Sequence, residues 1–131
     1  PNLAEVGLAA AVADLAAYAQ ASGLEVTVSI DPDVDLAAGT TAAAYRAVRE
    51  ALSNVRRHAR AGHVDVSLTP GTAGVATLTI RDDGVGFDPD DVPADHVGLR
   101  LLRDLAGSVG GTLQVRSTVG EGTTLTMELP A

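Results

Sequence analysis

Two stretches of the sequence bring together side chains that could do chemistry. The first is residues 40–60, where apolar positions recur at helical spacing. At about 100° per residue, one face of this predicted helix carries Glu50, Asn54, Arg57 and His58. Carboxylate and amide oxygens are ligands for Mg²⁺, and the two basic side chains could meet phosphate oxygens. An ordinary solvated helix face remains an alternative for this segment taken alone.

The second stretch is "RDDGVGFD", residues 81–88, which follows a run that alternates like a β-strand. Two adjacent carboxylates, Asp82 and Asp83, stand there against Gly84 and Gly86. Asp-Gly pairs are common connectors, because glycine tolerates positive φ. This stretch alone therefore leaves a simple turn and a functional loop open.

Composition limits the classes of protein that fit. The 131 residues are 46% hydrophobic, so we expect one domain with a real core over residues 1–131. The absence of cysteine excludes disulfides and thiolate chemistry, and it favours a reducing, cytoplasmic setting. A net charge of -8 argues against binding nucleic acid or an anionic membrane surface. Because the chain opens on Pro1, we expect it to be a fragment of a longer protein.

The remaining sequence predicts the elements that must position these side chains. Helices are expected at 3–21, 40–60 and 99–109, and strands at 24–30, 63–68, 75–80, 112–117 and 124–129. Ser22-Gly23 should end the first helix, and Thr40 or Thr41 should cap the second. "TPGTAG" and "TVGEG" predict two hairpins. Interleaved in this way, the elements predict an α/β two-layer sandwich, with helices on one face of a mixed sheet.

The order of these features is more specific than any one of them. "REALSNVRRHA" resembles the N box, "DDGVGF" the first glycine box, "GLRLLRDL" the second and "GEGT" the last glycine box of the Bergerat-type ATP-binding domain of histidine kinases. The resemblance covers nearly the whole chain and is weakest over residues 1–40. It implies a mostly antiparallel sheet of about five strands under three helices. The chain looks most like sensor kinases that partner NarL-type response regulators.

The resemblance implies roles at the adenine end of a nucleotide pocket. Asp82 matches the aspartate that accepts a hydrogen bond from the adenine amino group. Gly84 and Gly86 would let the backbone pass close to the nucleotide, and Asp83 would face solvent. Thr123 resembles the residue whose hydroxyl backs the adenine-binding aspartate.

The resemblance also implies roles at the phosphate end. Asn54 matches the Mg²⁺ ligand, and Glu50 matches an acidic residue that would serve catalysis by orienting a water molecule or supporting the metal. Arg57 would contact phosphate, and the ring of His58 would approach the nucleotide. The free N–H groups that begin the third helix would also bind phosphate oxygens, at Gly98, Leu99 and Arg100.

Two features depart from the family pattern. The lid between Phe87 and Val97 is short and acidic, and we expect it to be mobile without nucleotide. Leu101 stands where the family often has a small residue.

The resemblance implies an activity for which this chain holds only one part. The γ-phosphoryl group of Mg²⁺-ATP would pass to a histidine on a dimerisation domain that we do not find here, and then to a response-regulator aspartate. His58, His63 and His96 are better explained by other roles, so the fragment should not phosphorylate itself. One alternative is a serine kinase or switch protein of the anti-sigma type, using Glu50 as a base. Another is a non-enzymatic module whose glycines are only turns.

Overall fold

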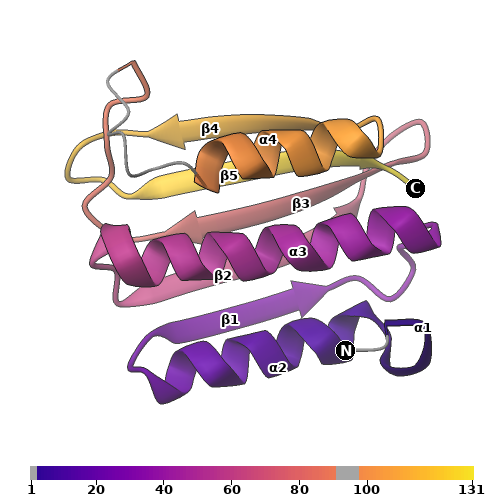
Figure 1. Cartoon of the computed structure of the whole chain (residues 1–131), viewed down its shortest axis with the longest axis horizontal. Helices are drawn as coiled ribbons and strands as arrows, with labels where there is room; N and C mark the ends of the chain where they lie inside the picture. Colours follow the sequence, from indigo (N-terminus) through magenta and orange to yellow (C-terminus); the bar gives the residue numbers. More distant parts are fainter. Residues whose placement is uncertain (1–2, 91–97) are drawn as a thin grey trace.

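The expected α/β sandwich is present. A computed structural model describes residues 3–90 and 98–131 (Figure 1). In chain order the elements are α1 (Leu3–Val6), α2 (Leu8–Ala21), β1 (Glu25–Ile30), α3 (Ala38–Asn54), the π-helix η1 (Val55–Ala59), β2 (His63–Pro70), β3 (Val75–Asp82), α4 (Gly98–Ser108), β4 (Thr112–Ser117) and β5 (Thr123–Pro130). The mobility expected of the lid concerns a segment that lies largely outside the described residues, at 91–97.

The five strands form one mixed, mostly antiparallel sheet in the order β1-β2-β3-β5-β4. Only the β1–β2 pair is parallel, and the two predicted hairpins appear as the antiparallel pairs β2–β3 and β4–β5. Strand β3 lies at the centre, between β2 and β5. Its last residue, Asp82, is opposite Val64 on one side and Thr123 on the other.

The core lies between the sheet and the three longer helices, which cover one of its faces (Figure 1). In β3 every second residue is buried, because successive side chains of a strand point to opposite faces. The largest fully buried side chains come from both layers: Val12, Val48, Val64, Val66, Leu68, Leu102 and Leu129. Within the described ranges, no helix has the length and apolar character needed to cross a membrane.

The helix boundaries differ from the sequence prediction at three points. The helix expected at 3–21 is broken at Gly7, whose φ of 79° no right-handed helix contains. The second helix begins at Ala38, so the prediction of Thr40 or Thr41 as its cap is wrong; Thr40 is buried, and the Thr41 hydroxyl donates to the carbonyl of Leu36. Its α-helical part ends at Asn54 and continues as the π-helix η1.

Candidate functional site

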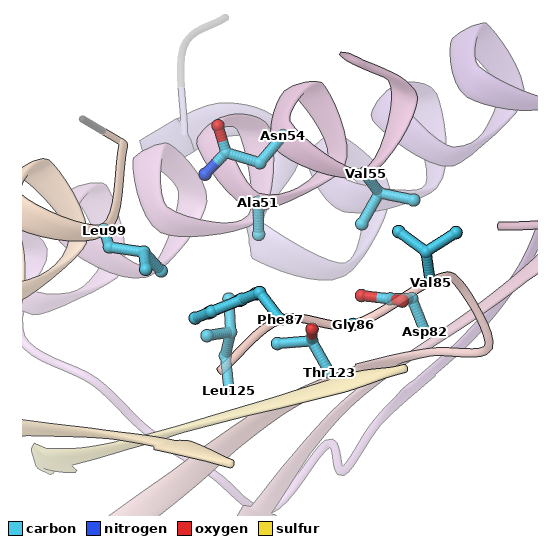
Figure 2. Close-up of a pocket in the computed structure, with 10 residues that line it drawn as sticks. All are labelled: Ala51, Asn54, Val55, Asp82, Val85, Gly86, Phe87, Leu99, Thr123 and Leu125. Carbon is cyan, nitrogen blue, oxygen red and sulfur yellow. The ribbon is translucent and has the colours of Figure 1, made fainter. Parts of the chain in front are cut away.

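A pocket opens between the C-terminal part of α3 and the sheet, at the end where β3 stops. It has about 490 Å³ of empty space when its open, solvent-filled mouth is included. Figure 2 shows helix residues on one side and sheet and loop residues on the other. The lining residues are Ala51, Asn54, Val55, Asp82, Val85, Gly86, Phe87, Leu99, Thr123 and Leu125. Most of this wall is apolar, so its few polar groups set which ligand fits.

Asp82 is a buried carboxylate in this wall, with only 9% of its surface exposed. The alternation of β3 directs it to the helix side of the sheet, where it follows Ile80 and Leu78 on the buried face. Its Oδ1 accepts the N–H of Gly84 at 2.8 Å. Burial raises the pKa of Asp82, although the N–H groups of Gly84 and Thr123 favour the ionised form and oppose that shift. The site thus holds a partly desolvated carboxylate with acceptor capacity for a ligand donor.

Two glycines allow the loop after β3 to approach the β4–β5 turn closely. Gly86 has a φ of 63°, and a Cβ there would overlap the carbonyl oxygen of Thr118. Gly122 has a φ of 80°, and a Cβ there would overlap the carbonyl oxygen of Asp82. Any larger residue at either position would push the loop and the turn apart. Backbone packing therefore requires glycine at position 86, and the role predicted for Gly84 and Gly86 in letting the backbone pass close to a nucleotide stays a prediction.

Ser117, which was not predicted as a site residue, joins the loop after β3 to the β4–β5 turn by hydrogen bonds. The N–H of Phe87 donates to Ser117 Oγ at 2.8 Å, and Ser117 Oγ donates to the carbonyl of Gly122 at 3.0 Å. The hydroxyl of Thr123 lies 2.8 Å from the same atom. The Thr123 hydroxyl predicted to back Asp82 is therefore paired with Ser117, whereas its backbone N–H is the group that supports the Asp82 carboxylate.

The polar face of α3 brings three of the four predicted side chains together. Arg57 Nη2 donates to Asn54 Oδ1 at 3.0 Å and lies 3.5 Å from Glu50 Oε1. Arg57 belongs to the π-helix η1, a type of turn that is frequent at functional sites. The backbone of His58 is also in η1, but its side chain lies outside the described part of the structure.

The N-terminus of α4 lies directly against this cluster. A Cβ at Gly98 would lie 2.5 Å from both Asn54 Nδ2 and Glu50 Oε1, so a larger residue would displace the ends of these two side chains. Leu99 lines the pocket, and Arg100 is exposed. The first N–H groups of a helix have no partner within it and carry partial positive charge. Donors suited to an anion thus lie beside the oxygen atoms of Glu50 and Asn54.

A hard cation fits these oxygens. Glu50 offers a carboxylate and Asn54 an amide oxygen, which are Mg²⁺ ligands, and Mg²⁺ commonly takes its remaining ligands from water and substrate phosphates. In the described ranges, no group of three or more His, Asp or Glu side chains could hold a metal by itself. A metal at this cluster would therefore depend on the ligand for part of its coordination.

Asp83 and His63 lie outside the pocket and have structural partners. Asp83 is exposed, as predicted, and its Oδ1 accepts the N–H groups of His63 and Gly62, which lower its pKa. His63 begins β2, as predicted, and its Nε2 lies 2.8 Å from Asp65 Oδ1. The hydrogen bond to Asp65 raises the pKa of His63.

Comparison with known proteins places this site in a family. The family model of histidine kinase-, DNA gyrase B-, and HSP90-like ATPases matches residues 39–131, which include the pocket and the cluster of Glu50, Asn54 and Arg57. The chain belongs to this family.

Several individual proteins are similar to the chain. The sensor histidine kinase NarS of Mycobacterium tuberculosis (strain ATCC 25618 / H37Rv) is 38% identical across 98% of this chain and 30% of NarS. LiaS, a sensor histidine kinase of Bacillus subtilis (strain 168), is 36% identical across 75% of this chain and 27% of LiaS. The blue-light activated histidine kinase of Erythrobacter litoralis EL346 superposes with a TM-score of 0.78 at 26% identity, over 94% of this chain and 41% of that structure. The chain thus spans less than a third of NarS or LiaS.

Proposed function

We propose that this chain is the ATP-binding catalytic domain of a sensor histidine kinase. The single observation that carries the proposal is Asp82, a buried carboxylate in the wall of a mostly apolar pocket. A desolvated acceptor of this kind favours a ligand that supplies a donor, because a partner without one would leave the charge unpaired. The adenine amino group is such a donor. Guanine, which presents a carbonyl oxygen at the corresponding position, would be rejected.

The phosphates would lie at the other end of the pocket, near the contact of α3 with α4. The N–H groups of Gly98, Leu99 and Arg100 would bind phosphate oxygens, and Arg57 would exchange its contact with Asn54 for a phosphate contact. Glu50 and Asn54 would hold Mg²⁺, which neutralises charge on the phosphates when bound. Transfer of the γ-phosphoryl group then depends on positioning and on charge neutralisation rather than on a covalent intermediate with this domain.

The acceptor of the phosphoryl group would be a histidine on a dimerisation domain of the parent chain. From there it would pass to an aspartate of a response regulator of the NarL type, in the cytoplasm. This part of the proposal rests on the resemblance in the N box and glycine boxes, and on similarity to NarS and to the nitrate/nitrite sensor protein NarQ of Escherichia coli (strain K12), 38% identical across 58% of this chain. Glu50 would act at the phosphate end by orienting the reacting groups.

Calorimetric titration tests the nucleotide site. Mg²⁺-ATP should bind the chain, and GTP should bind at least tenfold more weakly. Asp82→Asn should weaken ATP binding by about tenfold to a hundredfold, because a hydrogen bond to a charged acceptor is worth about 1.5–3 kcal/mol. Asp83→Asn is the matched control, one residue away and outside the pocket, and should keep wild-type affinity. Equal affinity for ATP and GTP, or unchanged ATP affinity in Asp82→Asn, would contradict the proposal.

A further inference from the structure

The hydroxyl of Ser117 has every hydrogen-bonding position filled. A serine hydroxyl carries one donor and two acceptor lone pairs. Ser117 Oγ donates to the carbonyl of Gly122 and accepts the N–H of Phe87, so the remaining contact, with Thr123 Oγ1 at 2.8 Å, is one that Thr123 donates. One atom at the end of β4 therefore joins the loop after β3 to the first residues of β5.

The partners of Ser117 are walls of the nucleotide pocket, whereas Ser117 is outside the described lining. Phe87 and Thr123 both line the pocket (Figure 2), and Gly86 between Val85 and Phe87 does so as well. A second tie, from the N–H of Gly120 to the carbonyl of Val85 at 2.6 Å, fixes the other side of Gly86. The 85–87 segment is thus held at both ends.

We propose that Ser117 is a positioning residue for the nucleotide site. Its hydroxyl holds Phe87 and Gly86 against the β4–β5 turn and so sets the wall that receives the adenine ring next to Asp82. Ser117 does not touch the nucleotide. This inference rests on the proposed function, because it deepens the account of the same pocket.

Removing the Ser117 hydroxyl would take a hydrogen-bond partner from two backbone groups. In Ser117→Ala the N–H of Phe87 and the carbonyl of Gly122 both lose the hydrogen bond that Ser117 makes in this part-buried region. The hydrogen bond from Gly120 to Val85 would remain, but the segment after Gly86 would be held to the turn less firmly. Ser117→Thr keeps the hydroxyl, and a β-branched side chain suits the end of a strand.

The test compares Ser117→Ala and Ser117→Thr with wild type. Calorimetry would give the affinities for ATP and for adenosine, and amide exchange would report the N–H of Phe87. We expect Ser117→Ala to bind ATP and adenosine about tenfold more weakly. The factor should be the same for both ligands, because the lost hydrogen bonds hold the wall on the adenine side, which both ligands contact. The Phe87 amide should exchange faster, and Ser117→Thr should restore both properties. The control is Ser108→Ala, which removes a hydroxyl bonded to Leu105 at the far end of α4 and should change neither.

Two results would overturn the proposal. One is wild-type affinity for adenosine in Ser117→Ala, even if the melting temperature falls, since this would make the residue merely structural. The other is unchanged exchange of the Phe87 amide. Failure of the wild-type chain to bind ATP would instead contradict the proposed function. The exchange rate of the Phe87 amide would then still show whether the Ser117 hydroxyl holds the loop.

Discussion

Two neighbouring aspartates at the end of β3 have opposite environments. Asp82 points to the helix side of the sheet and is buried, with a raised pKa, whereas Asp83 is exposed and has a lowered pKa. The period of two in a strand produces this contrast. A single-residue shift in register would exchange their roles, which is why the pairing of Asp82 with Val64 and Thr123 matters for the site.

The raised pKa of Asp82 predicts how adenosine binding depends on pH. The ionised carboxylate is the stronger acceptor for the adenine amino hydrogen, so protonation should weaken binding, and because the pKa of Asp82 is raised this effect starts at a higher pH than for an ordinary aspartate. Adenosine affinity should therefore fall as pH is lowered from about 7 towards about 4, where an ordinary aspartate titrates. Calorimetry with adenosine avoids titration of the phosphates. Affinity that stays constant or rises over this range would contradict a buried carboxylate acceptor.

The contribution of Asp82 to folding stability should change with pH in the opposite direction to adenosine affinity. Because its folded pKa is raised, Asp82 contributes most to stability at low pH, and this contribution is lost as pH rises through the folded pKa. Asp83 has a lowered folded pKa, so its contribution is present above its unfolded pKa and is lost only in stronger acid. Adenosine binding should thus weaken on acidification while the protein is still folded, as circular dichroism of the same samples would show.

At the scale of elements, the site is the junction of α3, η1 and the first turn of α4. The π-helix η1 carries Arg57 beside Asn54, and Gly98 lets α4 approach the same side chains. Each element supplies one kind of group: oxygen atoms from α3, a guanidinium from η1 and N–H donors from α4. The contact between α3 and α4 therefore places these groups side by side, and a change in it should alter stability as well as the proposed phosphate end.

Gly98→Ala tests the contact between these helices. The new Cβ would lie 2.5 Å from the side-chain ends of Asn54 and Glu50, which would have to rotate away, so we expect Gly98→Ala to raise the free energy of unfolding less than the control below does. Gly107→Ala, in the last turn of the same helix, is the control. Among the described residues nothing lies within 4 Å of its Cβ position, so it should raise stability by about 0.5–1 kcal/mol. Urea unfolding of both variants measures the difference, and equal effects would refute the close approach of α4.

The elements show which parts of this structure a sequence can predict. Alternation predicted all five strands, and apolar spacing predicted the three longer helices, because burial imposes these periods directly. The break at Gly7 and the π-helix η1 were missed, since one positive φ or one five-residue turn barely alters the apolar period. Ser117 was missed because its contact with Phe87 spans 30 residues and exists only once the β4–β5 turn meets the loop after β3.

In the whole molecule, the pocket and the cluster of Glu50, Asn54 and Arg57 lie at the end of the sandwich where β3 stops. The chain covers less than a third of NarS or LiaS, and the proposed phosphoacceptor is a histidine in another part of the parent protein. Of the three histidines, His63 is in β2 and is paired with Asp65 on the strand's exposed side. In the proposed function, nucleotide binding is thus assigned to this chain and phosphoryl acceptance to another part of the parent protein.

This separation predicts that the chain does not phosphorylate itself. Incubation with Mg²⁺ and ATP labelled at the γ-phosphate should leave the chain unlabelled, although ATP binds. Intact mass spectrometry of the same reaction, under neutral conditions that preserve phosphohistidine, is the independent check. Stoichiometric label on His58, His63 or His96 would show that an acceptor is present here and would contradict the assignment.

An amide NMR titration with adenosine and then with Mg²⁺-ATP would map the nucleotide site along its whole length. We expect adenosine to shift signals at the adenine end, such as those of Gly84, Gly86 and Thr123, and to leave those of Gly98, Leu99 and Arg100 largely unchanged. Mg²⁺-ATP should shift both groups, because its phosphates reach the start of α4 and the oxygens of α3. Shifts at neither group, or the same shifts for adenosine and ATP, would contradict a nucleotide site that runs from Asp82 to α4.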